Sequence, residues 1–173
     1  MILIVDISCN SLLKDEFVKP IEQIVKEKYE IKHYTKLKDL DNFSHIIICG
    51  TALKDNKYLD DIGFFKPIFK SKTKILGICG GAQIIAKYFG AKITNYQEIG
   101  MKNIEILKED KILKNFSQKE VYLMHNFAFE LPKDFESLAE TKIPVLIRKD
   151  NIYACLFHPE VKCEKIIENF LTT

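Results

Sequence analysis

The segment KILGICGGAQIIAKYFG, residues 74–90, decides the fold of this 173-residue chain. Its first five residues form an apolar run with branched side chains, which is typical of a strand buried on both faces of a parallel sheet. Cys79, Gly80 and Gly81 interrupt the run, and apolar residues then recur at helical spacing as far as Gly90. The segment therefore predicts a strand, a sharp turn and a helix, with Cys79 at the turn.

Other apolar runs extend this unit into a sheet. Residues 1–7 (MILIVDI), 45–49 (HIIIC) and 152–157 (IYACLF) have the buried-strand pattern, and residues 30–34 supply a shorter strand. Apolar residues at helical spacing lie between these runs, at residues 17–25, 59–69 and 160–171. Strands that alternate with crossover helices predict an α/β fold, an open and mostly parallel sheet with helices on both faces.

Residues 91–148 have a different pattern. Their strand-like segments, 103–107, 120–124 and 144–148, are short, and no crossover helix separates them. This pattern predicts a small mixed or antiparallel region attached to the parallel sheet. Because no repeat, linker or low-complexity tract interrupts the chain, we expect one domain spanning residues 1–173.

Composition excludes several classes of function. The chain has 26 Lys and Arg against 24 Asp and Glu, for a formal net charge of +2, which is too balanced for a nucleic-acid-binding surface. No apolar run approaches the ~20 residues that cross a bilayer, and no secretory signal is recognisable, so we expect a cytoplasmic protein without a membrane partner. The five cysteines include no C-x-x-C pair, which argues against a disulfide framework or a zinc site.

Cys79 has the surroundings of a nucleophile. Gly77-Ile78-Cys79-Gly80-Gly81 resembles the G-x-S-x-G turn with sulfur in place of oxygen, and a helix N-terminus favours a thiolate. The amide of Gly80 would face the charge that develops on an attacked carbonyl. The alternative is a tight strand-to-helix turn, or a phosphate-binding loop, in which Cys79 only fills space; against the phosphate loop, no Gly-Lys-Ser/Thr follows.

His158 and Glu160 are candidate partners of this thiol. His158 follows the last predicted strand, and Pro159 after it disfavours helical geometry at His158. Because the carboxyl ends of parallel strands share one sheet edge, Cys79 and His158 are expected to meet there. Glu160 would orient the imidazole, as the acidic member of a triad does. The alternative for His158 and Glu160 alone is a capped surface loop.

Two motifs carry a resemblance to a known family. GICGGAQ at residues 77–83 and FHPE at residues 157–160 occur in the order, and on the predicted elements, of a class I glutamine amidotransferase domain. The resemblance covers essentially the whole chain and includes the EIG segment at residues 98–100. It implies a flavodoxin-like sheet and the length of a free-standing glutaminase subunit.

The resemblance also implies a role for individual residues. Cys79 corresponds to the nucleophile that forms a γ-glutamyl thioester, His158 to the general base and acid, and Glu160 to its orienting partner. Gly50 and Gly80 correspond to the oxyanion hole, although Cys49-Gly50-Thr51 departs from the usual Gly-Gly-Pro loop. The residues that correspond to the glutamine-binding positions are Gln83, His125, Asn126 and Phe127.

The resulting functional hypothesis is a glutaminase subunit that hydrolyses L-glutamine and delivers ammonia to a separate synthetase, for which a guanylate (GMP) synthetase is the best single choice. The thiolate and the oxyanion amides supply the chemistry, so no metal or other cofactor is required. Two alternatives stay open. One is a stand-alone γ-glutamyl or cysteine peptidase, and the other is a non-catalytic relative in which Cys79 senses oxidants.

Overall fold

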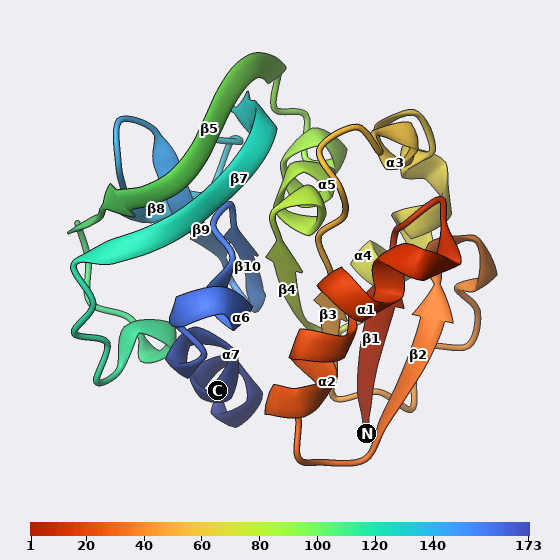
Figure 1. Ribbon diagram of the computed structural model, residues 1–173. Helices are drawn as coiled ribbons and strands as arrows, with labels where there is room; N and C mark the ends of the chain where they lie inside the picture. The colour runs from red at the N-terminus through yellow and green to blue at the C-terminus, as the bar shows by residue number, and fades with distance from the viewer.

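Five parallel strands form the centre of the protein, whose computed structural model describes residues 1–173 (Figure 1). In spatial order they are β2 (Tyr29–His33), β1 (Ile2–Asp6), β3 (His45–Ile48), β4 (Lys74–Ile78) and β10 (Ile152–Cys155). All residues of β1 and β3 are buried, which explains why their sequences are continuous apolar runs. The predicted parallel sheet is confirmed, and its strand boundaries lie within two residues of the expected ones.

Three antiparallel strands extend this sheet beyond β10. They are β9 (Pro144–Lys149), β8 (Glu136–Glu140) and β6 (Glu105–Ile106), in that order. Two further strands, β5 (Ile93–Asn103) and β7 (Glu120–Phe129), pair with each other in a separate antiparallel sheet. Figure 1 shows this long ribbon on the side of the molecule that holds β8, β9 and β10, with one end near α5 (Gly80–Tyr88).

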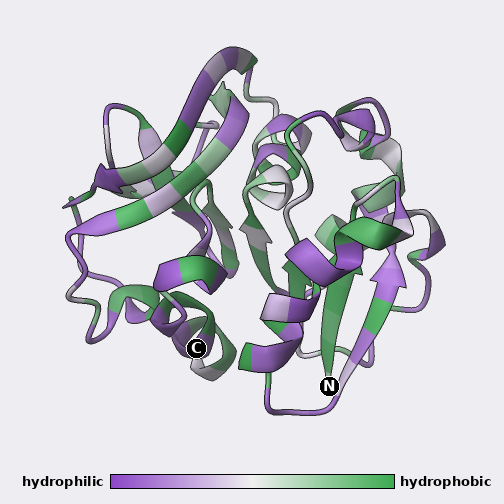
Figure 2. Cartoon of the chain, in the orientation of Figure 1, coloured by the Kyte–Doolittle hydropathy of each residue, from purple (hydrophilic) through white to green (hydrophobic).

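The mixed region is therefore as expected in kind, but its strands are longer than predicted. β5 has 11 residues and β7 has 10, whereas the sequence indicated short segments at 103–107 and 120–124. The reason is that the exposed positions of β5 are mostly polar and alternate with half-buried ones, so no apolar run marks the strand. In Figure 2 the ribbon alternates between hydrophilic and hydrophobic colours, while the central strands are mainly hydrophobic.

The helices form two groups that flank the sheet. One group contains α1 (Lys14–Phe17), α2 (Lys19–Ile24), α6 (Pro159–Lys162) and α7 (Lys165–Thr172). The other contains α3 (Lys57–Asp60), α4 (Lys66–Lys70) and α5. Short 3-10 helices occur at η1 (Ser11–Leu13), η2 (Tyr34–Lys36), η3 (Ile62–Phe65) and η4 (Lys111–Leu113). None of the helices is long and apolar enough to cross a membrane.

Three helices that the sequence predicts as continuous are interrupted. The expected helix at 17–25 is divided between α1 and α2, and the one at 59–69 is divided into α3, η3 and α4. Pro20 and Pro67 lie in the first turns of α2 and α4, where the missing N–H costs no internal hydrogen bond. The terminal helix breaks at Cys163, whose φ of −123° is not helical.

The hydrophobic core is one contiguous cluster of 49 buried residues. It joins the central strands to both groups of helices and includes Cys49, Cys155 and Cys163 as small buried side chains. A sequence with no disulfide or zinc pattern favours buried, unreactive cysteines, but Cys9 is an exception and lies on an exposed loop after β1. The carboxyl ends of β3, β4 and β10 meet at one edge of this core, and the candidate site lies there.

Candidate active site

Cys79 occupies the sharp turn between β4 and α5. Its backbone has φ of 49° and ψ of −102°, a left-handed region that a non-glycine residue rarely adopts. Its N–H donates to the carbonyl of Cys155 at 2.8 Å, and its carbonyl accepts from Gln83 N–H at 3.1 Å. These bonds to β10 and α5 hold the strained residue in place, as is typical of nucleophile turns.

The glycines around Cys79 permit this turn by their lack of side chains. A Cβ atom at Gly77 would lie 2.5 Å from the backbone of Gly81, and one at Gly81 would lie 2.3 Å from the carbonyl oxygen of Ile48. A Cβ at Gly80 would lie 2.7 Å from Ile7. The strand end and the helix start are therefore too close for a larger residue at Gly77 or Gly81, whereas at Gly80 the obstacle is the end of the Ile7 side chain.

His158 and Glu160 form a buried pair at the start of α6. Their side chains are 2% and 4% exposed, and His158 Nδ1 lies 2.7 Å from Glu160 Oε1. Because a carboxylate accepts, Nδ1 carries a proton and donates it to Glu160, and Nε2 is the nitrogen left for a second partner. The backbone N–H of His158 donates to the carbonyl of Tyr122 at 2.9 Å, which ties the residue to β7.

Gly50 lies between the histidine and the thiol. A Cβ atom added at Gly50 would be 3.1 Å from His158 Cε1 and 3.4 Å from Cys79 Cβ. The two side chains predicted to work together are thus brought to the same point, although 78 intervening residues separate them in the sequence. In this conformation the thiol donates to the carbonyl of Met124 at 3.4 Å, and His158 Nε2 has no partner.

The electrostatics favour a charged imidazole. Burial lowers the pKa of His158, but the interactions with the sulfur of Cys79 and with the carboxylate of Glu160 outweigh burial and hold that pKa well above the ordinary value. An imidazolium beside a thiolate is the form in which a cysteine attacks an amide carbonyl. Cys79 is therefore able to supply the nucleophile, and His158 the proton for the leaving group.

Backbone amides beside Cys79 are free to bind an oxyanion. The N–H groups of Gly50 and Thr51 donate to no backbone carbonyl, although both residues are buried. Gly80 is the first residue of α5, where helix geometry leaves the N–H without a partner. Buried N–H groups are normally paired, so unpaired ones around a nucleophile suit a developing negative charge. The sequence identified Gly50 and Gly80 but not the amide of Thr51.

The four residues predicted to bind glutamine line one cavity beside Cys79. They are Gln83, His125, Asn126 and Phe127. The Gln83 side chain bridges two elements: Tyr58 of α3 donates its hydroxyl to Oε1 at 2.6 Å, and Nε2 donates to the carbonyl of Phe127 at 2.9 Å. The Asn126 side chain bridges β5 and the loop that follows β3. It donates to the carbonyl oxygen of Leu53 in that loop at 2.8 Å and accepts from the Gln97 side chain of β5 at 2.7 Å.

The side chain of His125 is buried and neutral. Its Nδ1 donates to the carbonyl of Tyr96 at 3.0 Å, and Nε2 has no partner. Burial is the main reason that its pKa falls to about 4, and the nearby positive charge of His158 lowers it further. His125 thus presents an uncharged ring at neutral pH.

The cavity itself is small. Its volume is about 10 Å³, which is enough for about one water molecule and far too small for an amino acid. One wall is formed by Thr51, Ala52, Leu53 and Asn56 of the loop after β3, and Asn126 holds this loop at Leu53. Entry of a substrate therefore requires this loop or its neighbours to move.

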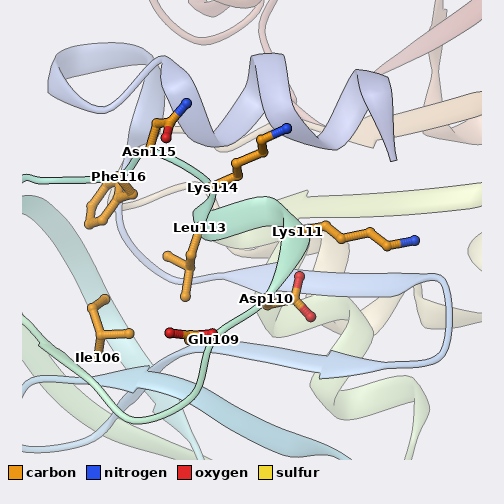
Figure 3. Close-up of a pocket in the computed structure, with 8 residues that line it drawn as sticks. All are labelled: Ile106, Glu109, Asp110, Lys111, Leu113, Lys114, Asn115 and Phe116. Carbon is orange, nitrogen blue, oxygen red and sulfur yellow. The ribbon is translucent and has the colours of Figure 1, made fainter.

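A larger hollow of about 580 Å³ lies elsewhere, around η4 (Figure 3). None of the candidate catalytic residues lines it. Asp110, which does, is already bonded to Arg148 at 2.8 Å and to the Tyr153 hydroxyl at 3.1 Å. Because Cys79 is not among its lining residues, this hollow is not the site of the cysteine chemistry. No group of three or more His, Cys, Asp or Glu residues is arranged to hold a metal ion.

Two functional contacts had no signal in the sequence. Tyr58 lies within a region predicted only as a helix and loop, and Met124 contributes a backbone carbonyl whose direction no motif encodes. Both reach Cys79 or Gln83 through the tertiary fold alone.

The fold and these residues define an α/β protein with a Cys, His and Glu set at the carboxyl edge of a parallel sheet. The sequence model of the family described as glutamine amidotransferase class-I matches residues 6–172, and the chain belongs to this family.

Several relatives are similar over most of the chain. A subunit of the glutamine-hydrolyzing GMP synthase of Sulfolobus acidocaldarius is 32% identical over 163 residues, covering 88% of this chain and 87% of that protein. The corresponding protein of Pyrococcus abyssi is 34% identical over 171 residues, covering 88% of each. A crystal structure assigned as a GMP synthase subunit from Thermoplasma acidophilum superimposes with a TM-score of 0.85 at 26% identity, covering 99% of this chain and 92% of that one.

Longer relatives match as well. The glutamine-hydrolyzing GMP synthase of Brachyspira hyodysenteriae is 38% identical over 118 residues, which cover 61% of this chain but only 23% of that protein. The chain therefore spans about a quarter of the length of such relatives.

Proposed function

We propose that this chain hydrolyses L-glutamine to glutamate and ammonia and passes the ammonia to a separate synthetase subunit that makes GMP. The observation that carries the proposal is the convergence of Cys79 and the buried His158–Glu160 pair on Gly50, beside unpaired backbone amides. The names and lengths of the two archaeal relatives, both GMP synthase subunits, support the choice of synthetase. We expect the reaction to occur in the cytoplasm, as the sequence predicts.

The proposed reaction proceeds in two halves. The Cys79 thiolate attacks the side-chain amide carbon of glutamine, and the oxyanion is stabilised by the amides of Gly80 and of Gly50 or Thr51. The C–N bond then breaks, His158 gives its proton to the leaving nitrogen, and ammonia departs from a γ-glutamyl thioester. In the second half His158 takes a proton from water, the hydroxide attacks the thioester, and glutamate leaves as the thiol is restored.

Labelling with a diazo-ketone analogue of glutamine tests this proposal. The purified chain is treated with the analogue, with and without a GMP synthetase subunit, and mass spectrometry locates the adduct. We expect a single adduct on Cys79 that excess L-glutamine blocks, and none in Cys79→Ala. Cys9, which is exposed, serves as an internal control because a non-selective electrophile would label it too.

The other outcomes separate the alternatives. Cleavage of γ-glutamyl peptides without any partner, at rates above glutamine hydrolysis, would favour a peptidase. Formation of sulfenate at Cys79 on peroxide titration, with no glutamine hydrolysis under any condition, would favour a redox-sensing role. Either result would refute the glutaminase proposal.

A further inference from the structure

We propose that Tyr58 is a positioning residue that orients the side-chain amide of Gln83 and thereby sets the affinity of the site for glutamine. The inference rests on the proposed function. It extends that function to a residue, Tyr58, that none of the sequence motifs contains. The residue lies in α3, 25 positions before Gln83, and its side chain reaches across to α5.

The hydrogen bonds of Gln83 leave only one orientation of its amide. The carbonyl oxygen of Phe127 can only accept, so the atom facing it at 2.9 Å must be Nε2. The other end of the amide is then Oε1, which accepts from the Tyr58 hydroxyl at 2.6 Å. Both ends of the amide are fixed, one by β7 and the other by Tyr58.

Tyr58 is suited to be a permanent donor. Its side chain is 3% exposed, and burial together with negative charge at Cys79 raises the pKa of its hydroxyl, which therefore keeps its proton. The ring also lies against the start of α5, where a Cβ atom added at Gly80 would be 3.2 Å from Tyr58 Cζ. Tyr58 is thus held firmly between the nucleophile turn and Gln83.

This arrangement has a consequence for recognition. Tyr58, Gln83 and Cys79 line the same cavity. After its bond to Phe127, Gln83 Nε2 keeps one hydrogen with no protein partner, which a carboxylate or carbonyl oxygen of an entering ligand can accept. Without the Tyr58 hydroxyl, Oε1 would be a buried acceptor with no partner, and the amide would be held at one end only, by the Phe127 carbonyl.

The variant Tyr58→Phe removes the hydroxyl and keeps the ring. We expect the half-saturating concentration of the diazo-ketone analogue, measured by labelling of Cys79, to rise about tenfold, which corresponds to the loss of one buried hydrogen bond. The maximal labelling rate should stay within about threefold, because the thiol is not displaced. Alkylation of Cys79 by iodoacetamide, which does not use Gln83, should also be unchanged.

Tyr153→Phe is the matched control. Tyr153 is also buried, at 4% exposure, and its hydroxyl donates to Asp110 at 3.1 Å, away from the cavity. We expect it to lower the melting temperature about as much as Tyr58→Phe without changing the half-saturating concentration. A double variant with Gln83→Ala tests whether Tyr58 acts through Gln83. Once the Gln83 side chain is absent, Tyr58→Phe should change the half-saturating concentration by less than about twofold.

Three results would overturn the inference. These are an unchanged half-saturating concentration in Tyr58→Phe, an equal change in Tyr153→Phe, or a full additional effect of Tyr58→Phe when Gln83 is already replaced. If the unmodified protein is not labelled with or without the synthetase, the proposed function itself is refuted, and this inference falls with it.

Discussion

Acidification should destabilise the fold through His125. The pKa of this buried ring is about 4, against about 6.5 for the exposed ring of the unfolded chain. Between these two pH values the unfolded chain binds a proton that the folded protein does not. The free energy of unfolding therefore falls as pH drops below about 6.5, and the contribution of His125 levels off only below about pH 4.

The size of the effect follows from the two pKa values. A difference of about 2.5 pKa units corresponds to about 3 kcal/mol at 1.36 kcal/mol per unit. Because the side chain of His125 is 1% exposed, solvent screening removes little of it. For a domain of ordinary stability, about 3 kcal/mol is a large share of the total.

Urea unfolding at pH values from about 7 down to about 4 measures this contribution. His125→Asn is the appropriate variant, since its amide still donates to Tyr96 O in place of Nδ1 but carries no titratable group. Subtracting the two curves removes the effect of other groups. We expect the stability of the natural protein to fall relative to the variant by about 2 kcal/mol near pH 5 and about 3 kcal/mol near pH 4. Parallel curves for the two proteins would refute the assignment of a neutral, buried His125.

Other predictions concern the catalytic pair and its surroundings. Gly50→Ala should leave the fold intact but push His158 by a few tenths of an ångström, since the new Cβ would lie 3.1 Å from His158 Cε1. We expect this displacement to lower kcat by about tenfold. An unchanged kcat would contradict this. His158→Ala should lower glutamine hydrolysis by about 10³-fold or more and Glu160→Gln by less, whereas equal and mild losses would refute the triad. Asn126→Ala should free the loop at Leu53 and speed iodoacetamide alkylation of Cys79 by about fivefold, the value of one hydrogen bond. No change in rate would show that this bond does not restrict access to Cys79.

Local sequence was sufficient where short-range sterics decide the structure. The turn at Cys79 was predictable because a side chain at Gly77 or Gly81 would collide with backbone atoms, and these two glycines stand within two residues of Cys79 in the sequence. The central strands were predictable for a similar reason, since burial on both faces demands continuous apolar runs. Helix continuity was harder, because prolines and local geometry at Cys163 interrupt segments whose apolar spacing is helical throughout.

The candidate site was predictable in its residues but not in its contacts. The parallel arrangement of β4 and β10 places Cys79 and His158 at one edge, so topology alone brings them near each other. The hydrogen bond from Cys79 to the Met124 carbonyl and the small size of the cavity depend on β7, whose length and register have no clear sequence signal.

The sequence by itself thus determined the parallel sheet and the strained turn and predicted Cys79, His158 and Glu160 as the candidate set, because these follow from consecutive residues and from the common direction of the strands. Only the tertiary structure decided that Tyr58 fixes Gln83, that Asn126 holds the loop at Leu53, and that the cavity is small. These contacts join segments 25 and 73 residues apart. Their partners are selected by packing across the fold, and no periodic pattern along the chain encodes that packing.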